Sequence, residues 1–299
     1  MRTEASSSTA EPSRSTTVDA LVATLARTLS RPEFLSEGPL WEARELVAFA
    51  LGIAPAQLAG RAGQAATAAQ HASLEAVMKR RADNAPTGYI VGAVDIGGVR
   101  FTVDRRGFIP RQDLVVLVEA GLLGAPAELQ GFALDLACGI GAAGICLALA
   151  RPGLHVDLAD VSPEAIELAR ENAERLVPGR ARAIASDLFA ALPGDRRGQY
   201  EVITANPPWV PDGTALPEEV IKHEPHVSFW GGPDGLDVVR RLVAELPSWL
   251  KPGGTYAQEC DPTQVAKVLL LLEEAGLREG RAHRDAEGVE RVVSARLLR

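Results

Sequence analysis

Four consecutive residues, Asn206-Pro207-Pro208-Trp209, carry the most specific chemical signal in the chain. They follow a short apolar run, which predicts that a buried β-strand ends just before them. The two prolines remove two backbone donors, so the side-chain carbonyl of Asn206 and the main-chain carbonyl of Pro207 form a rigid pair of acceptors. Such a pair can hold a planar NH2 group by both hydrogens against the indole of Trp209. In-line transfer of a methyl group to nitrogen requires this kind of alignment.

A glycine-rich turn earlier in the chain indicates where a methyl donor would bind. The apolar strand that contains Asp135 runs into Gly139-Ile140-Gly141 and then into a helix of small residues, and glycines let the backbone approach a ligand closely. The next strand ends in Asp160, an acid suited to a ribose diol. Ser162-Pro163-Glu164 then marks the start of a helix. A glycine turn alone would equally fit a dinucleotide site.

The order of the following elements separates these possibilities. Asp187 follows a third strand, where it can hold an adenine amino group or cap a helix that starts near Leu188, and Asn206 follows a fourth. This order resembles that of a class I S-adenosylmethionine-dependent methyltransferase of the Asn-Pro-Pro-aromatic group, which methylates amino or amide nitrogens. The segments 88–111 and 216–254 resemble the Ile-Pro-Arg, His-Glu-Pro and Gly-Gly-Pro-Asp-Gly-Leu-Asp regions of the HemK/PrmC type of glutamine N-methyltransferase. The similarity covers roughly residues 18–298.

The resemblance implies an α/β fold, the Rossmann-like class I methyltransferase fold, with a mostly parallel sheet, a small N-terminal helical domain and a β-hairpin linker. The alternation of helices, strands and glycine turns after about residue 113 is typical of the same class. We also expect a helix over 235–250 and a strand that begins at Thr255. The predicted domains are a disordered tail (1–17), a helical domain (18–87), a hairpin linker (88–111) and a methyltransferase domain (112–299).

The cofactor implied by these motifs is S-adenosylmethionine, with S-adenosylhomocysteine as its product. Asp135 can order the glycine loop or approach the methionine amino group, and Asp160 can contact the ribose or act as a helix N-terminal acid. The predicted cofactor-binding residues are Asp135, Ala137, Gly139, Gly141, Asp160, Val161, Asp187, Leu188 and Asn206. The predicted catalytic residues are Asn206 and Pro207. The predicted substrate-binding residues are Pro208, Trp209, Asp113, Glu224 and Glu259.

Three departures from the family pattern concern the methyl acceptor. Trp209 stands where the family usually has tyrosine, Gln112-Asp113-Leu114-Val115 replaces Pro-Glu-Thr-Glu, and Gln258-Glu259-Cys260-Asp261 replaces a Glu-Ile-Gly pattern. An indole face attracts a cation by about 1–2 kcal/mol when desolvated, and a guanidinium is planar, cationic and rich in donors. The departures therefore predict a small guanidino substrate, such as free L-arginine in a biosynthetic pathway. Its orienting carboxylate would be Asp113, Glu224 or Glu259.

The resemblance itself implies a different acceptor, the glutamine in the Gly-Gly-Gln loop of peptide chain release factors. Activity on a free amino acid or on an intact release factor separates the two. A binding module without catalysis is a third interpretation, and the intact Asn206-Pro207-Pro208 argues against it. A nucleic-acid adenine methyltransferase is a fourth. The net charge of −8 argues against it, because nucleic-acid enzymes normally carry a basic face, and no nucleic-acid partner is expected.

Composition bounds the remaining properties. The 299 residues are 46% hydrophobic, which is enough for a sizeable core. Apolar runs fall short of the about 18 residues of a membrane span, so no membrane association is expected. Cys138, Cys146 and Cys260 have neither disulfide nor metal spacing, so we expect no metal and a reducing, cytoplasmic location. The polar N-terminus differs from a signal peptide. A homodimer is compatible with the sequence.

Overall fold

The computed structural model describes residues 16–31 and 38–298, and the chain divides into two compact units, Met1–Val91 and Gly92–Arg299. The predicted tail, 1–17, lies outside the described residues apart from Thr16 and Thr17. Thr17 forms an isolated antiparallel bridge with Ala65. Within the described part of the chain, no helix is both long enough and apolar enough to cross a membrane.

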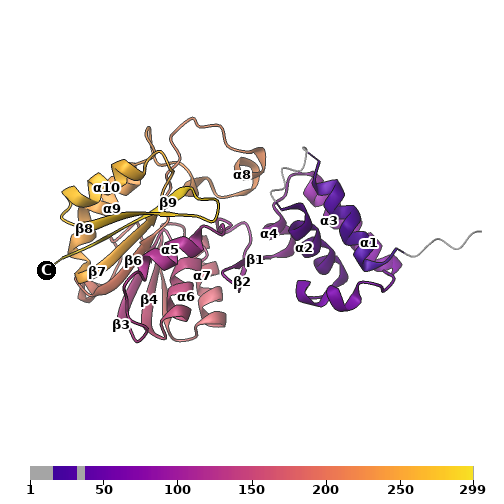
Figure 1. Ribbon diagram of the computed structural model, residues 1–299, viewed down its shortest axis with the longest axis horizontal. Helices are drawn as coiled ribbons and strands as arrows, with labels where there is room; N and C mark the ends of the chain where they lie inside the picture. The colour runs from indigo at the N-terminus through magenta and orange to yellow at the C-terminus, as the bar shows by residue number, and fades with distance from the viewer. Residues whose placement is uncertain (1–15, 32–37, 299) are drawn as a thin grey trace, which may run out of the picture. The chain divides into compact units, whose positions relative to one another are not determined.

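The first unit is a helical domain, as expected. Its described helices are α1 (Val18–Leu29), α2 (Pro39–Leu51), α3 (Ala68–Ala82) and α4 (Thr87–Val91), with short 3-10 turns at Pro55–Gln57 and Ala59–Arg61 (Figure 1). Val18, Leu21, Leu25 and Leu29 recur every three or four residues along α1, so one face of this helix is buried against α2. Gly52 ends α2 in the left-handed conformation, with φ of +69°.

A buried ion pair ties three of these helices together. The guanidinium of Arg81 on α3 donates to Glu42 Oε1 on α2, and the hydroxyl of Thr87 on α4 donates to the same oxygen at 2.6 Å. The side chains of both charged residues are almost completely buried. The buried negative charge of Glu42 is therefore compensated by a buried positive charge.

The second unit begins with a hairpin of β1 (Ala93–Ile96) and β2 (Val99–Thr102). Gly97 and Gly98 form its two-residue turn, with φ of +57° and +79°. A turn of this kind matches the right-handed twist of the flanking strands. It needs two successive residues with positive φ, which favours glycine at both positions. The predicted hairpin is thus present in the fold.

The rest of this unit is built on one seven-stranded sheet in the order β5-β4-β3-β6-β7-β9-β8 (Figure 1). Its strands pair in parallel except β9, which is antiparallel to both of its neighbours. The strands are β3 (Gln130–Leu136), β4 (Gly153–Asp160), β5 (Ala181–Ala185), β6 (Tyr200–Ala205), β7 (Leu250–Glu259), β8 (Arg278–Arg284) and β9 (Glu290–Arg296).

Helices cover both faces of the sheet. Successive side chains of a strand point to opposite faces, so each strand contributes to two apolar layers. One layer packs on α5 (Leu114–Gly121), α6 (Ala142–Ala150) and α7 (Pro163–Leu176). The other packs on α9 (Asp237–Glu245) and α10 (Val265–Glu274) and contains Leu134, Ile203 and Tyr256. A short helix, α8 (Glu218–His223), lies in the connection between β6 and α9. The class I methyltransferase fold predicted from the sequence is confirmed.

Two boundary predictions are wrong. The expected helix over 235–250 is shorter, because α9 spans Asp237–Glu245 and a 3-10 turn over Leu246–Ser248, which contains Pro247, ends it. Strand β7 already begins at Leu250, not at Thr255. The glycine-containing stretch between these residues is an irregularity within the strand, where the register with β6 shifts from Leu250 to Thr255.

Candidate active site

The strand order fixes where a ligand can bind. From β3 the chain proceeds through β4 and β5 to one side of the sheet, and then crosses to β6 and β7 on the other side. In an open α/β sheet, loops that leave two such strands turn in opposite directions, and ligands bind at the carboxyl ends of the strands at this point. The predicted glycine turn follows β3 and the Asn-Pro-Pro-Trp turn follows β6, so both lie at this point.

Asn206 comes directly after β6 and is half-buried. Its backbone N–H donates to the carbonyl of Leu136 at the end of β3, at 3.4 Å. No hydrogen bond among the described residues uses the Asn206 Oδ1 or Pro207 carbonyl oxygen as an acceptor. The two acceptors that the sequence singled out therefore keep unused hydrogen-bonding capacity.

Trp209 fixes the far end of this turn. Its carbonyl accepts a hydrogen bond from the Gln264 side-chain amide at 2.9 Å. Its side chain packs with a small apolar cluster that includes Val210, Val220 and Phe229. The indole is thus supported by other apolar side chains.

Glu259 lies beside Asn206, at the end of the neighbouring strand β7. The Asn206 Nδ2 amide donates to Glu259 Oε2 at 3.0 Å. Burial raises the pKa of Glu259 to about 7, with a further contribution from the negative charge of Asp113. Of the three carboxylates predicted to bind substrate, Glu259 is the one that contacts Asn206.

Asp135 is buried near the carboxyl end of β3 and joins three elements. One carboxylate oxygen accepts from the Thr204 hydroxyl on β6 and the other from the Gly144 N–H on α6, both at 2.9 Å. Burial raises the pKa of Asp135 to about 7. A Cβ at Gly144 would lie 2.3 Å from the Leu158 side chain, so any other residue here would have to displace that buried leucine. These contacts support the loop-ordering role for Asp135.

Thr204 and Gly144 were both missed in the sequence. Thr204 precedes Asn206 by two residues and so lies on the same face of β6, which was the available signal. Gly144 was hidden in a helix of small residues.

Asp160 closes the glycine turn from the next strand. Its Oδ2 accepts from the Gly139 N–H at 2.8 Å and its Oδ1 accepts from the Ser162 N–H at 2.9 Å. Burial raises the pKa of Asp160. Ser162 then caps α7 by accepting from the Ala165 N–H. Because an ionised carboxylate has about four lone-pair sites, Asp160 retains acceptor capacity for a diol. Val161, beside it, is exposed.

Asp187 lies at the surface, two residues after β5. It forms an ion pair with Arg241 at 2.7 Å, and both side chains are more than half exposed. The alternative in which it caps a helix is wrong, because a turn follows β5: the Ser186 hydroxyl donates to the Leu188 carbonyl and accepts from the Ala191 N–H.

Backbone strain marks two of the predicted cofactor loops. Four non-glycine residues of the described chain have positive φ, and two of them are Ala137 (+51°), after β3, and Leu188 (+50°), after β5. Such conformations cost about 1–3 kcal/mol and cluster at functional sites. Gly139 and Gly141, with φ of +52° and +82°, continue the turn after Ala137. A Cβ at Gly139 would meet nothing within 4 Å, so the backbone there borders open space.

The other two carboxylates bind protein groups. Glu224 is buried and accepts from the Ile109 N–H at 3.1 Å, and burial raises the pKa of Glu224 to about 7. Asp113 lies 3.7 Å from Arg291, which also pairs with Asp285 at 3.1 Å, and burial raises the pKa of Asp113. Glu224 thus connects the Ile-Pro-Arg turn to the segment after α8.

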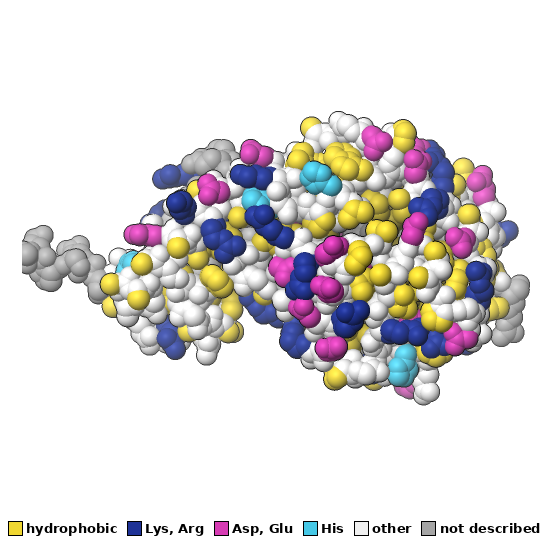
Figure 2. All heavy atoms as spheres, turned by 180° about the vertical axis from the view of Figure 1, so that it is seen from behind, with side chains coloured by type: hydrophobic (Ala, Val, Ile, Leu, Met, Phe, Trp, Pro, Cys, Tyr) yellow, Lys and Arg dark blue, Asp and Glu magenta, His cyan; other side chains and the backbone are white. Residues whose placement is uncertain are grey.

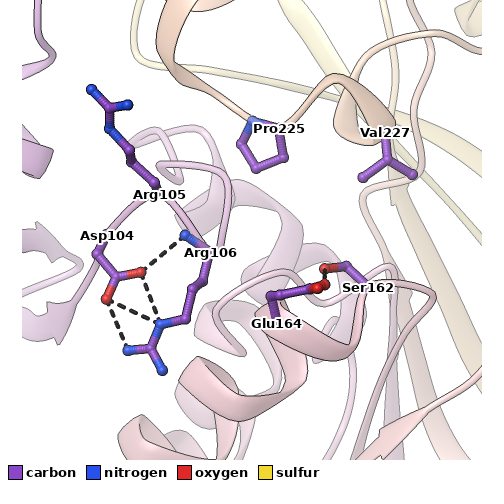
Figure 3. Close-up of a pocket in the computed structure, with 7 residues that line it drawn as sticks. All are labelled: Asp104, Arg105, Arg106, Ser162, Glu164, Pro225 and Val227. Atoms are coloured by element: carbon purple, nitrogen blue, oxygen red, sulfur yellow. Dashed lines mark hydrogen bonds and ion pairs between the residues drawn. The ribbon is translucent and has the colours of Figure 1, made fainter.

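A hollow adjoins the Asp160 loop (Figure 3). Its volume is about 630 Å³, within the range of ligand pockets. It is lined by Asp104, Arg105, Arg106, Ser162, Glu164, Pro225 and Val227. Arg106 is engaged by Asp104 on one side of this hollow, and Ser162 and Glu164 lie on the other (Figure 3). On the face of the molecule in Figure 2, basic and acidic side chains are interspersed.

Comparison with known proteins identifies the family. Residues 121–227 match the family described as methyltransferase small domain, and residues 23–92 match the PrmC N-terminal domain. A release factor glutamine methyltransferase from Cereibacter sphaeroides is 37% identical over 259 residues, which cover 86% of this chain and 90% of the relative. The chain belongs to the HemK/PrmC family. It is an S-adenosylmethionine-dependent N-methyltransferase, as the sequence predicted.

Two further similarities add detail to the HemK/PrmC assignment. A ribosomal protein uL3 glutamine methyltransferase from Bordetella pertussis is 38% identical over 192 residues, which cover 62% of this chain and 63% of the relative. A 16S rRNA methyltransferase from T. thermophilus, solved with AdoMet and guanosine, superposes with a TM-score of 0.51 at 24% identity, covering 69% of this chain and 50% of that one. The second similarity concerns the fold.

The site of this HemK/PrmC member fits S-adenosylmethionine. The carboxylate of Asp160, the strained turn that begins at Ala137 and the open backbone at Gly139 together offer acceptors and close approach at the end of the sheet. These are the groups that a ribose diol and a charged methionine moiety need.

The predicted guanidino substrate is wrong. The full-length relatives are named as glutamine methyltransferases of release factors, which supports the alternative acceptor over free arginine. The physical reason lies at Trp209, whose indole packs with Val210, Val220 and Phe229. The exchange of tyrosine for tryptophan is therefore accounted for by apolar packing and does not require a cation.

Proposed function

We propose that this enzyme methylates the side-chain amide nitrogen of a glutamine in a protein substrate, the glutamine of the Gly-Gly-Gln loop of a peptide chain release factor. The observation that carries the proposal is the pair of acceptors without an internal hydrogen bond among the described residues, Asn206 Oδ1 and the Pro207 carbonyl, in the turn that also contains Trp209. The names of the relatives support the same acceptor.

The acceptor pair orients the reacting nitrogen. A glutamine NH2 group has two hydrogens, and Asn206 and Pro207 can accept one each. Trp209 would support the flat amide from the side. With both hydrogens held, the nitrogen lone pair points in one direction, which converts an encounter into an aligned attack.

The loops after β3, β4 and β5 would hold the cofactor. Asp160 would accept from the ribose hydroxyls, while Ala137, Gly139 and Gly141 would shape the turn against the methionine moiety. Val161, Leu188 and Asp187 would border the adenine. Asp135 would keep this arrangement in place through Thr204 and Gly144. When bound, S-adenosylmethionine supplies a methyl group activated by a sulfonium.

No strong base is needed at the nitrogen. A new N–C bond forms as the S–C bond of the donor breaks, and the amide nitrogen then releases one of its protons. A protonated amide is a strong acid, so water can take that proton. Asn206 and Pro207 need only hold the nitrogen while this happens.

The test is a methylation assay with purified proteins. Release factor, S-adenosylmethionine and the enzyme are incubated, and peptides are analysed by mass spectrometry for one added methyl group on the glutamine of the Gly-Gly-Gln loop. A release factor with that glutamine replaced by alanine is the matched control. Methylation that persists in this control, or no methylation of the native factor, would overturn the proposal.

A ribosomal protein substrate is the second candidate. It is favoured by the 38% identity to the uL3 glutamine methyltransferase, although that match covers less of both chains. A parallel reaction with purified uL3 distinguishes the two proteins. Methylation of uL3 alone would keep the glutamine chemistry and change the partner.

A further inference from the structure

The side chain of Asn206 has two ends that differ in chemistry. Oδ1 accepts hydrogen bonds and Nδ2 donates them, and a half-turn about the last side-chain bond exchanges the two. The proposed substrate presents only N–H donors at the reacting nitrogen. Asn206 can therefore hold the reacting nitrogen when Oδ1 faces it, and repels that nitrogen when Nδ2 faces it.

The neighbouring strand supplies a group that can choose between these orientations. β6 and β7 are parallel, with Ala205 opposite Gln258, so the next residues, Asn206 and Glu259, lie side by side. Nδ2 donates to Glu259 Oε2 at 3.0 Å, and Glu259 is only 9% exposed. An ionised carboxylate can only accept, so the reverse orientation would bring two oxygen acceptors together where little water can separate them.

We propose that Glu259 is a positioning residue that fixes the Asn206 amide with its oxygen toward the substrate glutamine. The proposal rests on the proposed function for its kinetic readout. Glu259 acts through Asn206 and does not itself touch the reacting atoms.

The charge of Glu259 then controls turnover. A protonated carboxyl can donate to Oδ1 and so permits the reverse orientation. Burial raises the pKa of Glu259 to about 7, with Asp113 raising the pKa further and Arg291 and Arg111 lowering it. Cys260, the next residue on the chain, has a thiol whose own pKa burial raises to about 12, so it stays neutral. Ionised Glu259 predominates above pH 7, so kcat should fall as pH decreases through 7.

A charge exchange between the two positions tests the pairing. In Asn206→Asp, two carboxylates face each other, and kcat should fall at least about 100-fold because the acceptor is misplaced. In the double variant Asn206→Asp with Glu259→Gln, the glutamine amide can donate to the introduced aspartate, whose other oxygen still accepts from the substrate. We expect the double variant to recover at least about tenfold in kcat over Asn206→Asp. No recovery would overturn the proposal.

The single variant Glu259→Gln provides the pH test. Its amide can pair with Asn206 in either direction, so kcat should fall about tenfold while KM for S-adenosylmethionine stays within about twofold. The fall of kcat below pH 7 should disappear in this variant. Asp135 and Glu224 also have pKa values near 7. If the fall of kcat below pH 7 persisted in Glu259→Gln, it would be assigned to one of these two groups, and the role of Glu259 would be overturned.

Glu201→Gln is the matched control. Glu201 also lies on β6, the strand that Asn206 follows. It is near the start of that strand, where it pairs with Lys251. Removal of its charge should leave kcat and its pH profile unchanged.

A substrate-free measurement separates this proposal from the proposed function. The side-chain NH2 signal of Asn206, observed by NMR in protein labelled with 15N-asparagine, should shift with pH around 7 in the native enzyme and not in Glu259→Gln. If neither release factor nor uL3 is methylated, the proposed function fails and this signal still decides the pairing. An Asn206 NH2 signal that does not shift with pH in the native enzyme would overturn the pairing with Glu259.

Discussion

Two buried glutamates of this chain show how the same side chain serves a fold or a site. Glu42 in the first unit is 5% exposed and binds the charged guanidinium of Arg81 and the hydroxyl of Thr87. Glu259 in the second unit is 9% exposed, and its hydrogen bond comes from the neutral amide of Asn206. A buried charge that is matched by an opposite charge stabilises one geometry, whereas a poorly matched one has a raised pKa and can change its protonation near neutral pH.

The largest effect is expected from the loss of the amide that Glu259 binds. Asn206→Ala should lower kcat at least about 10³-fold, because one of the two proposed acceptors for the reacting nitrogen is removed. The affinity for S-adenosylmethionine should stay within about threefold. Single-turnover methylation of release factor measures the first, and titration calorimetry measures the second. Normal turnover in this variant would show that the site lies elsewhere.

The next-largest effect concerns stability, and it tests the buried ion pair of Glu42 and Arg81. Glu42→Ala removes the carboxylate that the buried Arg81 guanidinium binds and should lower the free energy of unfolding by about 3–5 kcal/mol. Denaturant unfolding of the first unit measures it. The double variant Glu42→Leu with Arg81→Met is the control. It removes both charges, and recovery of most of the stability is expected there, so a double variant as unstable as Glu42→Ala would refute the charge argument.

A smaller effect, of opposite sign, is expected at Glu259. Its pKa is raised to about 7 in the folded protein, so the folded state binds this proton more tightly than the unfolded chain, where glutamate titrates near about 4.3. The resulting stability is present below about pH 4 and is lost as pH rises through 7. Glu259→Gln avoids the loss. The free energy of unfolding of Glu259→Gln should exceed that of the native protein by about 1–3 kcal/mol at pH 8, and this difference should nearly vanish at pH 4.

Thermal unfolding of both proteins over this pH range tests the sign. Contributions from Asp135 and Glu224 cancel in the difference between them. A variant that is less stable at pH 8 would mean that the charged form of Glu259 is better solvated than its burial implies.

The smallest effect is expected at the surface. Asp187→Ala removes an exposed ion pair with Arg241 and should change the free energy of unfolding by at most about 0.5 kcal/mol. If Asp187 contacts the adenine, KM for S-adenosylmethionine should rise several-fold. Arg241→Ala breaks the same ion pair and keeps the carboxylate, so an equal rise in both variants would argue against that contact.

The elements that place the site were predictable because their signals are local. The glycine turn, Asp160 and Asn206 each follow an apolar run of strand length, and parallel strands bring their carboxyl ends to one edge. The fold class follows from the same alternation. Thr204 and Gly144 belonged to these elements, but their contact with Asp135 depends on how a helix and two strands pack.

The contacts between distant residues were not predictable. Glu42 and Arg81 are 39 residues apart, and Asn206 and Glu259 are 53 residues apart. Their pairing depends on helix packing in one unit and on strand register in the other. Trp209 shows the same limit, because its cation-binding face was inferred from residue type, whereas its apolar neighbours come from other segments of the chain.

The position of β9 has a consequence for the order of assembly. β9 follows β8 in the chain but lies between β7 and β8, and β8 at the edge has β9 as its neighbour in the sheet. Until β9 inserts, β7 is an exposed edge and β8 has no strand to pair with, which leaves backbone groups open to other chains. Val292 of β9 pairs with Glu259. The strand that completes the sheet therefore also completes the enclosure of the Glu259 carboxylate, and this enclosure cannot exist before β9 has joined β7.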